Sequence, residues 1–130
     1  RLGLTPKKSL TIDFPDVPTY CLRHFIRGCW DGDGTVYLEG DNPARGCAGF
    51  VSGSLRFVEA MEARLVGLGL PPVTVHHETR GSGAWYFRYH GAACARLAHV
   101  LYHGVDDSML YSRKHSIFMR ITEHYRAAGQ

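Results

Sequence analysis

The chain has 130 residues, of which 45% are hydrophobic, enough for one compact domain with an apolar core and too few for two ordinary domains. A formal net charge of +3 permits a polyanionic partner without requiring one. No apolar run approaches the roughly 20 residues that cross a bilayer, and no secretory leader begins the chain, so we expect no membrane partner and an intracellular location, whether cytoplasmic, nucleoid-associated or in an organelle.

The first 18 residues predict an extended lead-in, because Pro6, Pro15 and Pro18 surround the short alternating run Leu10–Phe14. The chain opens on arginine rather than methionine, which leaves open a truncated N-terminus. From Pro18, which suits a first helical turn, hydrophobic residues recur at helical spacing until two glycines stop the pattern. These residues are Leu22, Phe25, Ile26, Cys29 and Trp30, and they predict a helix over about 19–32.

A hairpin and a second helix follow directly. Thr35–Glu39 alternates between hydrophobic and polar residues, which predicts a half-buried strand, and the turn residues 40–43 lead to a returning strand over Gly46–Ser52. Ser54 is a suitable N-cap for a helix that ends within 67–71. Its expected buried face carries Phe57, Val58, Met61 and Leu65.

The same pattern then repeats. Val73–Glu78 and Ala84–His90 predict a second hairpin around a Gly-Ser-Gly turn, followed by a helix near 92–102 and a last helix from about Ser108 to Tyr125. The order αββαββα predicts a single α+β domain over residues 1–130, with four mostly antiparallel strands on one face and the helices on the other.

One segment joins these elements to chemistry. Phe25–Gly34 ends a helix in two aspartates separated by a glycine and begins a strand directly afterwards. The segment resembles the LAGLIDADG motif of homing endonucleases. Ile26-Arg27-Gly28 takes the first three places of the motif, Cys29-Trp30 the next two, and Asp31-Gly32-Asp33-Gly34 its acidic end. Lys8–Pro15 and Val51–Ser54 also resemble that family, so the likeness spans most of the chain and implies a saddle-shaped four-stranded sheet.

The two glycines of the helix indicate how subunits would meet. Gly28 and Gly32 are four residues apart, on one helix face, where they would let two helix backbones approach closely. Because the chain has a single motif, we expect the partner to be the same helix of a second copy, giving a homodimer with Cys21 and Phe25 on the same interface stripe. This pairing would bring two copies of Asp33 together, and two close carboxylates repel unless a divalent cation lies between them.

The resemblance implies a site-specific endonuclease of intron or intein mobility, which cuts double-stranded DNA at a long, near-palindromic site. Its cofactor would be Mg²⁺, for which Mn²⁺ or Ca²⁺ would substitute in binding. Asp33, with Gly32 beside it, would hold the metal that activates water, whereas Asp31 is interpreted as structural. Lys114, in the segment Tyr111–His115, would stabilise phosphate charge, and Ser52 would position water.

The strands offer a surface for DNA, because polar residues alternate with the hydrophobic ones on both hairpins. Arg88 is suited to read guanine, and Arg45 and Arg80 lie in the hairpin tips, where we expect them to contact phosphates. The full set expected to contact DNA is Tyr37, Glu39, Arg45, Thr74, His76, Arg80, Tyr86, Arg88 and His90. An ordinary solvated sheet face would show the same alternation.

Other functions are compatible with parts of the sequence. The chain could be a non-cleaving LAGLIDADG protein, either an RNA maturase or a DNA-binding regulator, although intact Asp31 and Asp33 favour the nuclease. An EF-hand is excluded because loop positions six and twelve hold Val36 and Asn42. The four cysteines form no CxxC pair and sit inside apolar patterns, so buried free thiols are expected rather than disulfides or a zinc site. A zinc hydrolase is conceivable from His99 and His103 with His76, His77 and Glu78, but no HExxH motif is present.

Overall fold

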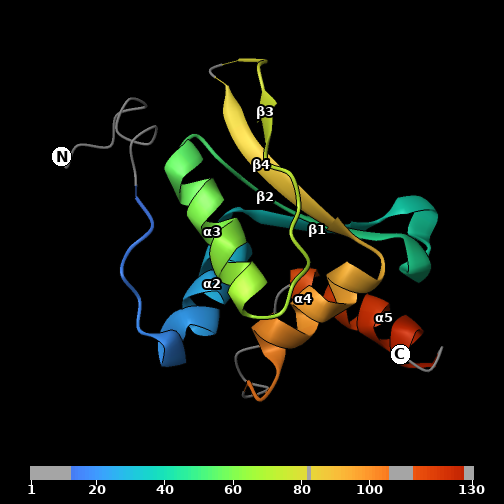
Figure 1. Cartoon of the computed structure of the whole chain (residues 1–130). Helices are drawn as coiled ribbons and strands as arrows, with labels where there is room; N and C mark the ends of the chain where they lie inside the picture. The colour runs from blue at the N-terminus through green and yellow to red at the C-terminus, as the bar shows by residue number, and fades with distance from the viewer. Residues whose placement is uncertain (1–12, 82, 106–112, 128–130) are drawn as a thin grey trace.

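The computed structural model describes residues 13–81, 83–105 and 113–127, and its helices and strands form an α+β arrangement (Figure 1). The helices are α2 (Thr19–Asp33), α3 (Leu55–Gly67), α4 (Ala92–Tyr102) and α5 (Arg113–Ala127). The strands are β1 (Gly34–Leu38), β2 (Gly46–Ser52), β3 (His76–Glu78) and β4 (Ala84–His90). Two short 3-10 turns, η1 (Glu39–Asp41) and η2 (Pro43–Arg45), connect β1 to β2.

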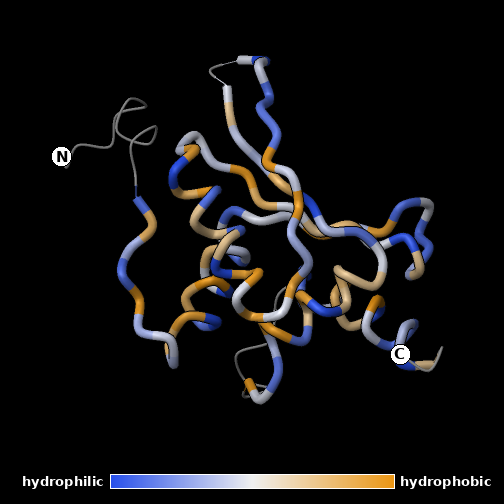
Figure 2. Tube along the Cα trace, viewed as in Figure 1, coloured by the Kyte–Doolittle hydropathy of each residue, from blue (hydrophilic) through white to orange (hydrophobic). Residues whose placement is uncertain are grey.

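The four strands form one antiparallel sheet in the order β1-β2-β4-β3, so the two hairpins join through β2 and β4. The register places Val36 opposite Ala48, and Phe50 opposite Phe87, with all four side chains buried under the helices. On β1 and β4, residues of the opposite parity include the exposed Thr35 and Arg88, whereas on β2 both Cys47 and Gly49 of that parity are buried. Figure 2 shows the hydrophobic and hydrophilic residues alternating along the elements, as expected where each has one buried face.

The core is built around Trp30, which is completely buried. Its ring centroid lies 5.6 Å from that of Phe50 and 6.2 Å from that of Phe87, so α2 is packed directly on the two central strands. The indole Nε1 donates a hydrogen bond to the carbonyl oxygen of Thr35 at 3.1 Å, which satisfies the one polar atom of this side chain.

Gly34 explains why β1 begins without a linker after α2. A Cβ at this position would collide with the indole ring of Trp30, whereas the backbone of glycine fits against it. The predicted helix therefore extends one residue further, to Asp33, and the predicted strand begins one residue earlier, at Gly34. The last predicted strand residue, Glu39, lies in η1 instead.

The end of the lead-in packs on the helices. Phe14 has its ring centroid 5.3 Å from those of both Phe25 on α2 and Phe57 on α3, and Asp13 forms an exposed ion pair with Arg56 at 3.2 Å. Residues 13–18 have no regular secondary structure. The rest of the predicted Leu10–Phe14 strand lies outside the described residues.

Two predicted elements differ in their bounds. The prediction of a strand over Val73–Glu78 is wrong at its start, because β3 covers only His76–Glu78. The backbone amide of Val73 donates to the carboxylate of Glu62 on α3 at 3.0 Å, which directs this segment towards α3. The last helix is described from Arg113, and the first residues of the prediction, from Ser108, lie outside the described residues.

The four cysteines are free thiols, as the sequence predicts, but the expected burial is found only for Cys47 and Cys94. Cys47 and Cys94 are buried, and burial raises the pKa of the Cys94 thiol to about 12, so this thiol stays protonated at neutral pH. Cys21 and Cys29 are partly exposed on α2. In the described part of the chain, no helix is both long and apolar enough to cross a bilayer.

We predict that Gly34→Ala lowers the free energy of unfolding by about 1–3 kcal/mol, because the added methyl group overpacks the core against Trp30. Urea denaturation followed by circular dichroism measures this change. Gly67→Ala is the matched control, since a Cβ at Gly67, the last residue of α3, would meet no atom within 4 Å. Equal stability of the two variants would contradict the role assigned to Gly34.

Candidate functional site

The C-terminal end of α2 is held by a lysine from another helix. The last turn of α2 has no basic residue of its own, and the final carbonyl groups of a helix lack intrahelical partners. Lys114 of α5 adds a charged donor at this end. Its Nζ donates to the carbonyl oxygen of Asp31 at 2.9 Å and to that of Trp30 at 3.1 Å, which also accepts the backbone amide of Gly34. Its positive charge also lies at the negative end of the helix dipole, so this contact fixes the end of α2 against α5.

The two aspartates of the motif have different surroundings. Asp31 accepts a hydrogen bond from the Tyr102 hydroxyl on α4 at 3.1 Å. Asp33, the last residue of α2, is exposed, and within the described residues its carboxylate makes no hydrogen bond or ion pair. The pKa of the Cys29 thiol is raised, first by burial and then by the nearby charge of Asp33. Asp31 thus contacts the fold, whereas Asp33 is available to a ligand.

A cavity of 360 Å³ opens beside this helix end. Lys114 and Arg113 of α5 line it together with Asp31, Gly34 and Thr35. Two cationic side chains therefore lie at the junction where α2 becomes β1, directly beside Asp33 in the chain. An anionic group such as a phosphate would meet favourable charge in this cavity.

Ser52 lies at the same end of the sheet but outside that cavity. The β1–β2 pairing ends with Gly34 opposite Phe50, so Ser52 is two residues beyond it. Its hydroxyl oxygen accepts a hydrogen bond from the backbone amide of Ser54 at 3.1 Å, in the turn that begins α3. The structure gives Ser52 a local structural contact and leaves its hydroxyl proton available to a further acceptor.

The donor atoms at this helix end suit a hard divalent cation but do not complete a site. The carboxylate of Asp33 and the carbonyl of Gly32 are the oxygen ligands that Mg²⁺ prefers. Among the described residues, no three His, Cys, Asp or Glu side chains are grouped closely enough to hold a metal ion. A metal would therefore need further oxygen ligands from a phosphate, water or a second subunit.

The four histidines named above for a zinc hydrolase lie in two separate places. His99 and His103 stack with their ring centroids 4.6 Å apart at the end of α4. On β3, by contrast, His76 stacks on Tyr86 and His77 on Trp85. The set weighed above for a zinc hydrolase is therefore split between a helix end and a strand.

One face of α2 is not covered by the rest of the described chain. Gly28 and Gly32 are exposed, and a Cβ built on either glycine would meet no atom within 4 Å outside the helix. Cys21 is partly exposed on the same stripe, and Tyr20 beside it is 82% exposed. Phe25 is less available, because its ring packs edge-on against Phe14 of the same chain.

The outer face of the sheet carries a row of aromatic and basic side chains. The guanidinium carbon of Arg88 lies 4.7 Å from the ring centroid of Tyr86, and the ring of His76 stacks on the same tyrosine with 5.4 Å between the centroids. A cavity of 290 Å³ joins this row to Thr74 and His90, so Thr74 reaches the surface although it lies outside β3. A second cavity, of 210 Å³, joins Arg88 to Thr35 on β1.

The arginines of the two hairpin tips are both paired with glutamates. Arg80 donates two side-chain hydrogen bonds to Glu78, at 3.2 and 2.9 Å, and these bonds lower the pKa of Glu78 to about 2. Arg45 lies 3.7 Å from Glu39. Each pair is exposed, so each arginine can exchange its partner for another anion at small cost, but the pairs add little net positive charge.

Tyr102, Arg23 and Arg27 were not identified from the sequence. Arg23 and Arg27 of α2 donate to the carbonyl oxygens of Val100 and Leu101, at 3.3 and 3.0 Å, at the C-terminal end of α4. The sequence gives one indication of this capping, since the last turn of α4 contains no arginine or lysine of its own. That absence predicts a cap from elsewhere but not its source.

Comparison of the chain with protein-family models, curated proteins and solved structures finds no match. The function of the site at the junction of α2 and β1 is therefore inferred from the arrangement of its own residues.

We predict that Lys114→Met lowers the free energy of unfolding by about 1–3 kcal/mol, because the part-buried carbonyl of Trp30 and the exposed carbonyl of Asp31 lose a charged donor at the end of α2. Chemical denaturation at neutral pH measures the loss. The matched control is Arg120→Gln on the same helix, which breaks only the exposed 3.1 Å ion pair with Asp41 and should cost at most about 1 kcal/mol. A larger loss in the control than in Lys114→Met would overturn the capping role.

Proposed function

We propose that the chain is a subunit of a LAGLIDADG-type homing endonuclease, which pairs with a second copy and cuts double-stranded DNA with the help of Mg²⁺. The observation that carries this proposal is the uncovered glycine face of α2, which ends in the exposed Asp33 at the edge of the sheet that carries the exposed Arg88 on its outer face. The resemblance of Phe25–Gly34 to the family motif supports the same conclusion.

The proposed dimer uses α2 from each subunit. Without side chains at Gly28 and Gly32, two such helices can pack with their backbones close together around a two-fold axis. The exposed Tyr20 and the partly exposed Cys21 extend the contact along the same helix. Since α2 ends at Asp33, the dimer would place one carboxylate from each subunit near the axis.

In the proposed reaction, Asp33 holds the metal with its carboxylate, and the carbonyl of Gly32 is a further oxygen ligand. Bound Mg²⁺ would activate water and stabilise the charge on the leaving oxygen. Lys114 has three donors, of which two hold the end of α2, so the third is left for a phosphate oxygen. Ser52 can donate its hydroxyl proton to a water on the same edge of the sheet.

The proposed DNA surface is the outer face of the sheet. Arg88 projects from the central strand β4 and is steadied by the ring of Tyr86, which suits a bidentate contact with guanine in the major groove. Tyr37, His76 and His90 offer polar edges along the same face. Arg45 and Arg80 would contact phosphates by exchanging their glutamate partners, so their contribution should fall with rising salt.

A non-cleaving nucleic-acid-binding protein of the same fold, an RNA maturase or a DNA-binding regulator, is the second candidate. It is favoured by the single free carboxylate at the helix end and by the lack of a three-residue metal group among the described residues. The two candidates differ in one measurement, since only the nuclease converts a bound duplex into two fragments.

We predict that Asp33→Asn reduces cleavage to the level measured with EDTA, while DNA affinity stays equal or rises, because a negative charge facing phosphate is lost. The assay is cleavage of a randomised duplex library with Mg²⁺, followed by sequencing of the cut ends and by a binding measurement. Asp31→Asn is the matched control, because asparagine still accepts the hydrogen bond from Tyr102 and cleavage should persist.

Selective capture of a site without any cleavage by the wild-type protein would favour the binding protein over the nuclease. Weakened DNA binding with preserved cleavage in Asp33→Asn would contradict the proposed role of Asp33 as a metal ligand.

We predict that Gly28→Leu converts the dimer to a monomer, because the bulky side chain projects into the proposed helix seam. Sedimentation equilibrium measures the mass, and circular dichroism checks the fold, which should be retained because the position is open in the single chain. Glu59→Leu, an exposed position on α3 away from α2, is the control and should leave the mass unchanged. A dimer of unchanged stability in Gly28→Leu would refute the seam.

A further inference from the structure

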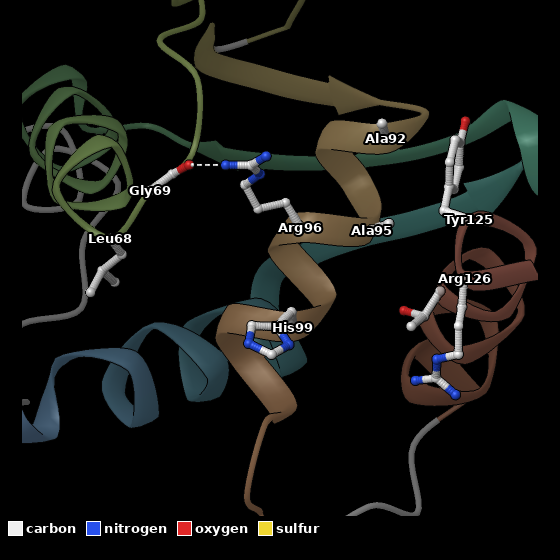
Figure 3. Close-up of a pocket in the computed structure, with 9 residues that line it drawn as sticks. Leu68, Gly69, Ala92, Ala95, Arg96, His99, Tyr125 and Arg126 are labelled. Carbon is white, nitrogen blue, oxygen red and sulfur yellow. Dashed lines mark hydrogen bonds between the residues drawn. The ribbon is translucent and has the colours of Figure 1, made fainter. Parts of the chain in front are cut away.

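Basic side chains of the helix layer and of the sheet are held in different ways. Beside α4 lies a cavity of 520 Å³, where Arg96 donates to the carbonyl oxygen of Gly69 on one side of the helix. Figure 3 shows Arg126 on α5, pointing away from Arg96, so these two arginines offer no common site to a ligand. On the outer face of the sheet, by contrast, the single side chain of Arg88 is held along its whole length.

Gly49 lies in the middle of that outer face. In β2 it pairs with Thr35 of β1 on one side and with Arg88 of β4 on the other. Its chain neighbours Ala48 and Phe50 belong to the core under the helices, so Gly49 is on the opposite face of the strand. Gly49 is nevertheless buried. Side chains from the flanking strands therefore cover it.

The stem of Arg88 occupies the space that a side chain at Gly49 would need. A Cβ built on Gly49 would lie 3.1 Å from Cγ of Arg88, and 3.3 Å from both the carbonyl oxygen of Phe87 and Oγ1 of Thr35. All three distances are shorter than an ordinary van der Waals contact of a Cβ, which begins at 3.4 Å. The φ angle of Gly49 is not in the left-handed region, so the close approach of Arg88, and not the backbone conformation, favours glycine here.

The other end of the Arg88 side chain is held by an aromatic ring. Its guanidinium carbon lies 4.7 Å from the ring centroid of Tyr86, and that ring is itself stacked with His76 across the strands. Among the described residues, the guanidinium group makes no hydrogen bond or ion pair. Glu78, the acid that lines the adjoining cavity of 210 Å³, is bound by Arg80. The donors of Arg88 are thus free although its position is fixed.

A guanidinium group that is fixed in this way suits the recognition of one base. Arginine reads guanine through paired hydrogen bonds to O6 and N7, which requires the plane of the guanidinium group to meet the base edge in one orientation. A side chain that already lies in that orientation loses less conformational freedom on binding. Bulk at Gly49 would lift the stem of Arg88 from the sheet and change the direction of its donors.

We propose that Gly49 is a positioning residue for base recognition, which lets Arg88 lie across β2 and meet one guanine in each half of the DNA site. Gly49 acts through Arg88 and needs no contact with the base. This inference rests on the proposed binding of double-stranded DNA, and it applies to a nuclease and to a non-cleaving DNA-binding protein alike.

The test is selection of bound sites from a randomised duplex library, followed by sequencing, in buffers that contain Ca²⁺ or EDTA and no Mg²⁺. For the wild-type protein we expect guanine at one position of each half-site, and Arg88→Ala should reduce the preference for that guanine about tenfold or more. Gly49→Val should reduce the preference at the same position about fivefold or more and leave the other positions unchanged. In the double variant, Gly49→Val should add no further loss, because its effect passes through Arg88.

A second variant and a control separate this role from a general effect on the sheet. Gly49→Ala adds only the Cβ, so it keeps the test open if valine prevents folding, and it should weaken the guanine preference about twofold or more. Val51→Thr is the matched control, because it changes an exposed side chain of β2 without adding bulk beside Arg88. It should leave the guanine preference intact. Circular dichroism checks that each variant is folded.

Four results would overturn the proposal. An unchanged guanine preference in folded Gly49→Val, or an equal loss in Val51→Thr, would remove the role of Gly49. A loss of affinity that is the same for every sequence would indicate a structural role alone. A further loss in the double variant would show that Gly49 acts without Arg88. Selection of no duplex by the wild-type protein would overturn DNA binding as well, whereas the first three results leave DNA binding standing.

Discussion

The packing of Trp30 against the backbone of Gly34 is the constraint on which the rest of the structure depends. Because Gly34 has no side chain, α2 turns into β1 with no intervening residue, and the indole ring lies between the helix and the central strands. The same close junction leaves Asp33 exposed at the edge of the sheet. The core and the proposed active site are thus consequences of one contact.

The ends of the helices are tied together by cations from neighbouring helices. Lys114 of α5 caps α2, and Arg23 and Arg27 of α2 cap α4, so each of these helix ends depends on the placement of another helix. Such contacts are worth more than exposed ion pairs because they place a charged donor against carbonyls at the negative end of a helix. They also make the position of Asp33 depend on α5, which is far away in the sequence.

The net charge of +3 overstates the positive charge that is available to DNA, because several basic side chains already have partners within the fold. Lys114, Arg23 and Arg27 are engaged by carbonyls, and Arg45 and Arg80 by glutamates. The outer face of the sheet therefore attracts DNA less by total charge than by the placement of a few side chains.

The amino-acid sequence alone determined the order of helices and strands, the alternating burial of β1 and of the end of β4, and the place of Asp33 at the helix end. These features follow from local periodicity, because the backbone geometry of a helix or strand sets which side chains share a face. Only the tertiary structure decided that β3 begins at His76, since the amide of Val73 is bound by Glu62 on α3.

The tertiary structure also decided which cations are engaged and which line a cavity. Lys114 and Arg126 are both basic residues of α5, yet one caps α2 while the other faces a cavity beside α4. A hydrogen bond between residues more than 80 positions apart leaves no periodic trace in the sequence. The hydrogen bond between Lys114 and the end of α2 exists only because packing of the core brings α2 and α5 together.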